Sequence, residues 1–169
     1  MAVALGSYIL VYMRILGIDP GTGILGFGII DVNERRHLKM VDAGVITTPA
    51  RTAHGERLEE IFDELTKLVS QLKPDVLSIE KLFFSRNITT AMTVAEARGV
   101  ALLVAQRAKL PIHEYTPNQI KQTVTGSGKA DKKQVQEMVR LTLGLKEAPK
   151  PDDCADALAA AITHAQMTR

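Results

Sequence analysis

The segment covering residues 14–32 constrains the fold of this chain more than any other. Its sequence, RILGIDPGTGILGFGIIDV, places two apolar runs rich in β-branched residues on either side of a Pro-Gly-Thr-Gly turn. Such runs favour strands, whereas Pro and Gly favour a tight reversal between them. The pattern predicts an antiparallel hairpin whose first strand ends at Asp19. After the polar turn at residues 33–36, the run HLKMVDAGVITT predicts a third strand of the same meander.

Two glycine-containing motifs resemble nucleotide-binding signatures, but neither fits its surroundings. Gly21, Gly23 and Gly26 form the pattern G-x-G-x-x-G after a strand, where a dinucleotide-binding fold requires a helix to follow. Residues 24–30 are β-branched, aromatic and glycine-interrupted, so they favour a strand instead. The sequence GSGK at residues 126–129 ends like a P-loop, yet the leading glycine and the closing Ser or Thr are missing. The glycines of the first motif are therefore interpreted as turn residues.

The rest of the chain alternates between strand and helix patterns. Apolar residues between Leu58 and Leu72 recur at three- and four-residue spacing, which is typical of a helix that packs on a core. Other patterns predict two more strands, at residues 76–80 and 112–116, and three more helices, at residues 89–109, 134–145 and 152–166. No element is predicted for residues 117–124. Together these elements predict an α/β fold with a mixed five-stranded sheet flanked by helices.

Length and composition favour one domain without a strongly basic surface. The chain has 169 residues, which are enough for one well-formed core and too few for two ordinary domains. With 21 Lys and Arg against 19 Asp and Glu, the net charge is +2, so any DNA contact must come from a local patch. The single cysteine, Cys154, excludes an intramolecular disulfide and fits a small buried residue in a reducing cytoplasm. His164 is interpreted as a surface residue.

The first twelve residues differ in character from the rest of the chain. They precede a second methionine, Met13, and are expected to form a poorly ordered N-terminal extension (residues 1–12) to a domain at residues 13–169. They are apolar, but they lack a basic leader region and fall well short of the ~20 residues of a membrane span. No membrane segment is therefore expected.

Four acidic residues stand where a functional site could form. Asp19 and Glu80 each end a predicted strand, and Asp153 and Asp156 lie three positions apart on one face of the last predicted helix. A solvated turn acid or capping of that helix by Asp152 or Asp153 is the alternative interpretation. Capping does not explain Asp156, whose small neighbours favour close packing of the helix on the sheet.

Carboxylates that gather in one place repel each other unless a cation lies among them. Oxygen ligands without a Cys or His cluster favour Mg²⁺ or Mn²⁺ over zinc. A pair of such ions can hydrolyse a phosphodiester bond, because they lower the pKa of a bound water and stabilise the leaving oxygen. The acids therefore indicate phosphoryl-transfer chemistry.

Four segments carry a resemblance to a known family. ILGIDPGTGILGFGII, SIEKLFFSRN, IKQTVTGSGKADKKQVQ and DDCADALAAAITHA occur in the order and spacing typical of bacterial Holliday junction resolvases, so the chain resembles the RuvC family from residue 13 onward. The resemblance implies an RNase H-like fold and an endonuclease that nicks four-way DNA junctions symmetrically, leaving 5′-phosphate and 3′-hydroxyl ends. It implies a metal site of two ions built from Asp19, Glu80 and Asp153, with Asp156 as the second acid of the closing D-x-x-D motif. Cys154 stands where we expect a small residue such as Ala, which changes no ligand chemistry.

The resemblance also implies residues that contact DNA. Phe83 matches an aromatic residue that stacks on an unpaired base near the crossover, although packing in the core is the alternative for it. Lys121 and Lys132 match lysines near the scissile phosphate, where a cation binds backbone oxygens or stabilises developing charge. Arg86 and Lys129 are candidates for the same basic patch.

The resemblance further implies partners. A homodimer is implied because a two-fold junction calls for a two-fold enzyme, with the Ala-rich helix at residues 89–109 in the interface. The branch-migration proteins RuvA and RuvB are implied as further partners.

Three other functions stay open at this point. The related YqgF family of nucleases, tied to ribosomal RNA processing, shares the opening hairpin, although the Phe83 segment and the closing DDCAD favour the RuvC family. A junction-binding protein with inert acids would require that the carboxylates do not converge. Actin-like ATPases and sugar kinases share the Asp-x-Gly-Thr-Gly turn, but they clamp ATP between two lobes, each of roughly the size of this whole chain.

Overall fold

The structure of the chain is a computed structural model that describes residues 11–82 and 88–168. The strand β1 begins at Val11, two positions ahead of the predicted domain start at Met13. All five predicted strands and all four predicted helices are present, with ends that differ by a few residues. The elements in chain order are β1 (Val11–Asp19), β2 (Ile24–Asn33), β3 (Leu38–Thr47), α1 (His54–Leu72), β4 (Val76–Glu80), α2 (Ile88–Arg107), β5 (Ile112–Tyr115), α3 (Pro117–Thr125), α4 (Lys132–Thr142) and α5 (Asp152–Met167).

The described strands form one mixed sheet in the order β3-β2-β1-β4-β5. β1 pairs antiparallel with β2, and β2 pairs antiparallel with β3, so the first three strands form the predicted meander. β4 pairs parallel with β1, and β5 pairs parallel with β4. This topology confirms the predicted α/β fold, and it brings the C-terminal ends of β1 and β4 to the same edge of the sheet.

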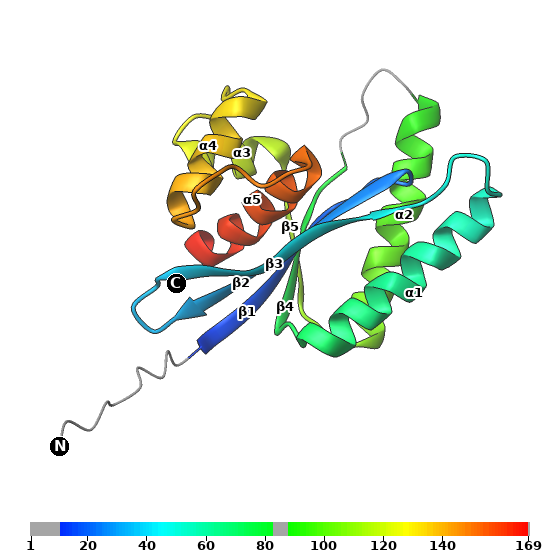
Figure 1. Cartoon of the computed structure of the whole chain (residues 1–169), viewed down its shortest axis with the longest axis horizontal. Coiled ribbons are helices and arrows are strands. Elements are labelled where there is room, and N and C mark those ends of the chain that lie inside the picture. Colours follow the sequence, from blue (N-terminus) through cyan, green and yellow to red (C-terminus); the bar gives the residue numbers. More distant parts are fainter. Residues whose placement is uncertain (1–10, 83–87, 169) are drawn as a thin grey trace.

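Helices cover both faces of the sheet (Figure 1). α1 and α2 lie on one face, where Ile61 and Leu65 of α1 pack in one buried cluster with Ile18 and Leu25 of the hairpin. α3, α4 and α5 lie on the other face and form a second buried cluster. Burial of apolar surface in the two clusters supplies the main stabilisation of the fold. No helix in the described part of the chain is long and apolar enough to cross a bilayer.

Three glycines let α5 lie directly on the hairpin. A side chain at Gly17 of β1 would collide with the backbone of Ala157, and one at Gly28 of β2 would collide with Leu158. A side chain at Gly26 of β2 would collide with the backbone of Asp153. The small residues of α5 and these glycines therefore permit a close approach of helix and sheet, as the sequence predicts for the segment around Asp156.

Capping boxes fix the starts of α3 and α4. At α3, the side chain of Thr116 accepts a hydrogen bond from the backbone of Gln119, whose own side chain accepts one from the backbone of Thr116. Asp131 and Gln134 form the same reciprocal pair at α4. No helix is predicted from the sequence at α3, although Thr116-Pro-x-Gln is a local signature for a helix start. α4 begins two residues before the predicted position because Asp131 caps it.

His164 is buried, so its interpretation as a surface residue is wrong. Its side chain is 1% exposed, and its Nδ1 atom lies 2.8 Å from the hydroxyl of Tyr115 on β5. The ring of His164 also lies against that of His113 on β5, so this side of α5 faces the sheet rather than solvent. The interpretation of Cys154 as a small buried residue is confirmed, since it is 1% exposed.

Candidate active site

Asp19 and Glu80 lie at the same edge of the sheet. Asp19 is the last residue of β1, and Glu80 is the last residue of β4. The parallel pairing of the two strands sets Ile18 beside Ile79, immediately before the two acids. The sheet therefore joins two carboxylates that are far apart in the sequence.

The helix α5 brings Asp153 and Asp156 to this edge. Gly26 pairs with Asp19 across the hairpin and touches the backbone of Asp153, so Asp153 lies over the end of β1. One turn further along α5, Asp156 lines a cavity together with Glu80. Pro151 occupies the N-cap position of α5 without a side-chain hydrogen bond, so capping does not account for these acids. All four acids selected from the sequence thus meet at one end of the sheet.

The electrostatics of the acids reflect this proximity. Burial, together with the negative charges of Asp156, Glu80 and Asp153, raises the pKa of Asp19 to about 7. Burial and Asp156 also raise the pKa of Glu80, while the positive charge of Lys121 opposes this shift. Burial raises the pKa of Asp156 as well, against the hydrogen bond from Lys132. Carboxylates perturbed in this way are typical of functional sites, since a nearby cation would stabilise their charged forms.

Two of the predicted lysines lie among the acids. The Nζ atom of Lys132 lies 3.1 Å from Oδ2 of Asp156 and 3.6 Å from Oδ2 of Asp152. Burial disfavours the charge of Lys132, but its hydrogen bond to Asp156 and the attraction of that carboxylate outweigh burial and raise its pKa. Lys121 and Lys132 line one cavity of about 310 Å³ with Glu80 and Asp156. The remaining lining residues are Pro117, Ile120, Val135 and Ala159.

The four carboxylates fit a hard divalent cation by their chemistry. They offer only oxygen atoms, which Mg²⁺ and Mn²⁺ prefer, and burial together with neighbouring carboxylates raises the pKa values of Asp19, Glu80 and Asp156. Across residues 11–82 and 88–168, no three acidic, histidine or cysteine side chains are close enough together to enclose a metal ion. Asp156 pairs with Lys132. The donor atoms therefore suit such a cation, while the described side chains are not arranged to enclose one.

The other predicted DNA-binding residues lie apart from this cavity or outside the described residues. Lys129 is exposed in the loop between α3 and α4 and does not line the cavity. Phe83 and Arg86 lie outside the residues that the structure describes.

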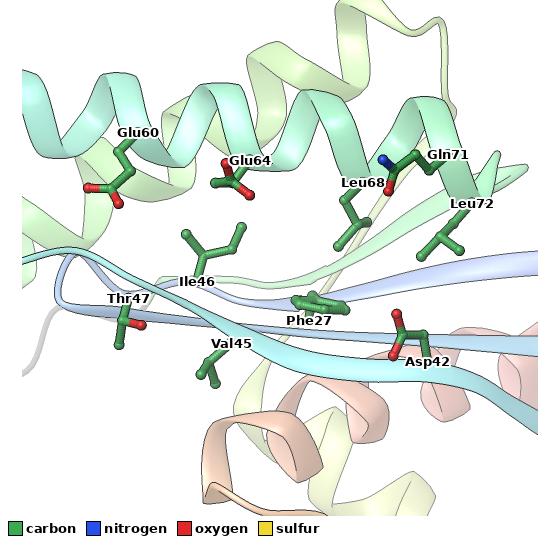
Figure 2. Close-up of a pocket in the computed structure, with 10 residues that line it drawn as sticks. All are labelled: Phe27, Asp42, Val45, Ile46, Thr47, Glu60, Glu64, Leu68, Gln71 and Leu72. Atoms are coloured by element: carbon green, nitrogen blue, oxygen red, sulfur yellow. The ribbon is translucent and has the colours of Figure 1, made fainter.

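A second cavity lies on the other face of the sheet, between α1 and the strands β2 and β3 (Figure 2). It measures about 400 Å³, and Phe27, Ile46 and Leu68 form much of its apolar wall. Glu60 and Glu64 of α1 border it, and no lysine or arginine of the described residues lines it. Because acidic side chains repel a phosphate backbone, this cavity does not suit a phosphodiester substrate. The cavity beside Glu80, which Lys121 and Lys132 line, suits it better.

The fold and the site together define the class of RNase H-like nucleases. The defining features are a hairpin with a third meander strand, two parallel strands, helices on both faces of the sheet and acids at the strand ends. The family model of "Crossover junction endodeoxyribonuclease RuvC" matches residues 15–164, and the chain belongs to the RuvC family. Nucleases of this family depend on metal ions.

Individual relatives agree with this assignment. Proteins with the same name from Chloroflexus aurantiacus and Brevibacillus brevis are 54% and 56% identical to this chain, over 90% and 92% of it and 93% of each relative. The solved structure of Thermus thermophilus RuvC in complex with a Holliday junction substrate is 37% identical. The match covers 92% of this chain and 94% of the Thermus chain, with a TM-score of 0.86. The predicted fold and family are therefore confirmed.

Proposed function

We propose that this chain is a structure-selective endonuclease that resolves Holliday junctions in DNA recombination and repair. The observation that carries the proposal is the meeting of Asp19, Glu80, Asp153 and Asp156 at one sheet edge in a chain of the RuvC family. The reaction is the hydrolysis of two DNA phosphodiester bonds at symmetric positions. It leaves 5′-phosphate and 3′-hydroxyl ends.

The proposed cofactor is a pair of Mg²⁺ ions, for which Mn²⁺ can substitute. The four carboxylates are the proposed ligands, and the raised pKa of Asp19 supports this role because a cation would relieve the repulsion around it. When bound, such ions lower the pKa of a water molecule and stabilise the leaving oxygen. The chain supplies Asp19 and Glu80 from the ends of paired strands and Asp153 and Asp156 from the first turns of α5. These rigid elements limit how far each carboxylate can move.

The lysines beside the acids are proposed to bind the DNA backbone. Because Lys121 and Lys132 line the cavity with Glu80 and Asp156, a phosphate that enters it meets two ammonium groups. Such groups bind phosphate oxygens and stabilise the negative charge that develops during cleavage. Arg86 and Lys129 are proposed to extend the contact along the backbone, and Phe83 to stack on an unpaired base.

The proposed active form is a homodimer, because a junction with two equivalent strands calls for two equivalent sites. Met92 and Leu103 of α2 support an interface on this helix, since these large apolar side chains are 57% and 51% exposed. RuvA and RuvB are the proposed partner proteins, and the cytoplasm is the proposed location.

The deciding experiment compares cleavage of a labelled synthetic four-way junction with cleavage of a matched linear duplex in Mg²⁺. The proposal requires paired symmetric nicks in the junction alone, and their loss in EDTA and in the variant Asp19→Asn. Asp63→Asn changes an exposed acid on α1 and is the matched control, which should cut like the unmodified chain. Equal cutting of the duplex, or preferential cutting of RNA, would indicate a different nuclease, and junction binding without cutting would indicate a binding protein.

A further inference from the structure

The helix α2 is hydrogen-bonded to both strand ends that carry site acids. At the hairpin, the hydroxyl of Thr22 donates a hydrogen bond of 2.7 Å to the backbone carbonyl of Thr93 on α2. At β4, the Nε atom of Arg98 on α2 donates a hydrogen bond of 3.1 Å to the backbone carbonyl of Glu80. Thr22 follows Asp19 in the turn, and Glu80 is itself a site acid. One helix therefore spans the two strand ends from the face opposite to α5.

The contact at Thr22 belongs to a chain of hydrogen bonds that runs through two buried threonines. Thr22 and Thr48 are each 7% exposed, and the hydroxyl of Thr48 donates to the backbone carbonyl of Thr22 over 2.6 Å. The Nε atom of Arg57 on α1 donates to that same hydroxyl of Thr48 over 2.8 Å. Thr22, in the turn after Asp19, is thus bonded to α2 through its side chain. Its backbone carbonyl is linked to α1 through Thr48 and Arg57. Loss of a buried hydrogen bond leaves its partner unsatisfied and is therefore unfavourable.

The contact at Arg98 is also largely removed from solvent. The side chain of Arg98 is 15% exposed, and its guanidinium pairs with the carboxylate of Glu114 on β5. β5 lies next to β4, with Glu114 beside Ile79. Arg98 therefore joins α2 to the ends of two adjacent strands. A guanidinium suits this role because its planar array of donors can serve two acceptors in fixed directions.

We propose that Thr22 and Arg98 are positioning residues, which set the separation of Asp19 and Glu80 through α2 and so preorganise the metal ligands. Neither side chain touches the DNA or the metal in this role. The inference rests on the proposed function, because it assigns metal binding to Asp19 and Glu80. Hydrogen-bond partners that orient metal ligands typically change metal affinity or activity by about 10–100-fold when they are removed.

The test uses two variants and two matched controls in the full-length chain. Thr22→Val keeps the shape of the side chain and removes the donor to Thr93, and Arg98→Met keeps much of the length and removes the donor to Glu80. Thr66→Val removes a threonine hydrogen bond to the backbone within α1, and Arg107→Met removes an exposed arginine at the end of α2. Each protein is titrated with Mn²⁺ while its melting temperature is recorded, and its junction affinity is measured in EDTA.

The expected result is a rise in the half-saturating Mn²⁺ concentration on the order of 10-fold for Thr22→Val and for Arg98→Met. Junction affinity in EDTA stays the same, and both controls match the unmodified chain. Thr22→Ser restores the donor and should restore the Mn²⁺ response. Removal of either hydrogen bond already frees one strand end from α2. The rise in the half-saturating Mn²⁺ concentration of the double variant should therefore be smaller than the product of the two single rises.

An unchanged Mn²⁺ response in folded variants would overturn the inference, even if their melting temperatures fall. If Arg98→Met does not fold, Arg98→Lys and the Thr22 series decide the question in its place. Glu114→Gln tests the ion pair separately and should leave the Mn²⁺ response near that of the unmodified chain. The titration does not depend on cleavage, so a chain that binds Mn²⁺ but cuts no junction would refute the proposed function and leave the positioning role standing.

Discussion

The Nζ atom of Lys132 lies 3.1 Å from Oδ2 of Asp156, so a cation of the chain itself already contacts one of the proposed metal ligands. Lys132 also lines the cavity beside Glu80, where the scissile phosphate is proposed to enter. If a metal ion bound Asp156, the ammonium group of Lys132 would be free to contact the phosphate. Lys132→Met should lower kcat for junction cleavage by about 100-fold, comparable to the loss of one donor from a preorganised anion site.

The metal response separates this role of Lys132 from a role in holding the acids. If Lys132 acts on the phosphate, the half-saturating Mn²⁺ concentration should not rise in Lys132→Met, because a competing cation has been removed from Asp156. Lys67→Met is the control, since Lys67 is exposed on α1 and pairs only locally with Glu64. A large rise in the Mn²⁺ requirement with unchanged kcat at saturation would contradict the prediction.

Asp19→Asn should stabilise the metal-free chain while it abolishes cleavage. Burial and the neighbouring acids raise the pKa of Asp19 from 3.8 to about 7, so the folded state binds the proton more tightly than the unfolded state. The stabilisation that Asp19 gives is present below about pH 4 and is lost as the pH rises through 7. At about pH 8 in EDTA, the free energy of unfolding of the variant should exceed that of the unmodified chain by up to about 4 kcal/mol.

Urea denaturation in EDTA measures this difference, with Asp63→Asn as the control for loss of an exposed charge. Cleavage of the four-way junction is measured on the same preparations. A variant that is less stable than the unmodified chain, or that still nicks the junction, would contradict the assigned role of Asp19.

Metal removal should lower the melting temperature of the unmodified chain. At a concentration of Mg²⁺ about 100 times its Kd, binding to the folded state alone adds about 2.7 kcal/mol to the free energy of unfolding. For a chain of this size, that corresponds to a rise in Tm of roughly 5–11 °C. Differential scanning fluorimetry with Mg²⁺ and with EDTA measures the rise, which should vanish in Asp19→Asn. ATP should give no rise beyond that of the Mg²⁺ it carries, and a specific ATP effect would favour the ATPase alternative.

Local patterns in the sequence are enough to predict the hairpin, the long helices and the positions of the four acids. Asp19 and Glu80 end apolar runs, and the rule that parallel strands end at one edge brings such residues together. The helix α3 escapes prediction because its apolar face is short, and its start signal is only the pair of Thr116 and Gln119. The burial of His164 escapes prediction because a single polar residue on an apolar helix does not reveal the partner that satisfies it.

The hydrogen bonds of α2 are a second feature that could not be predicted from the sequence. Thr22 and Thr93 are far apart in the sequence, as are Thr22 and Thr48, and no periodicity in the chain relates them. Such contacts depend on how whole elements pack, so they become visible only in the structure. In the sequence, Arg98 likewise does not differ from other helical arginines. Only the structure reveals that it donates a hydrogen bond to the carbonyl of Glu80.

Gly17→Ala should destabilise the fold by separating α5 from the sheet. A side chain at Gly17 would collide with the backbone of Ala157, which cannot move away as a flexible side chain could. Overpacking of this kind costs about 1–3 kcal/mol, and the shift of α5 should also weaken the Mn²⁺ response by moving Asp153 and Asp156. Gly55→Ala is the control, because nothing lies within 4 Å of a side chain at that position in α1. It should not destabilise the fold, as measured by urea denaturation.

His164 should make the fold sensitive to mild acid. Burial, together with the nearby His113, lowers the pKa of His164 from 6.5 to about 4, so the folded state resists protonation of this ring. Between these two pH values the unfolded state binds the proton and the folded state does not. The stabilisation is therefore present above about pH 6.5 and falls by up to about 3 kcal/mol as the pH drops to 4. His164→Gln can still form a hydrogen bond with the hydroxyl of Tyr115 and cannot be protonated, so it should show a smaller loss of stability between about pH 7 and pH 4. His37→Gln, at an exposed position, should lose as much stability as the unmodified chain. An equal loss in His164→Gln and in the unmodified chain would show that other groups, chiefly the carboxylates, set the acid limit of the fold.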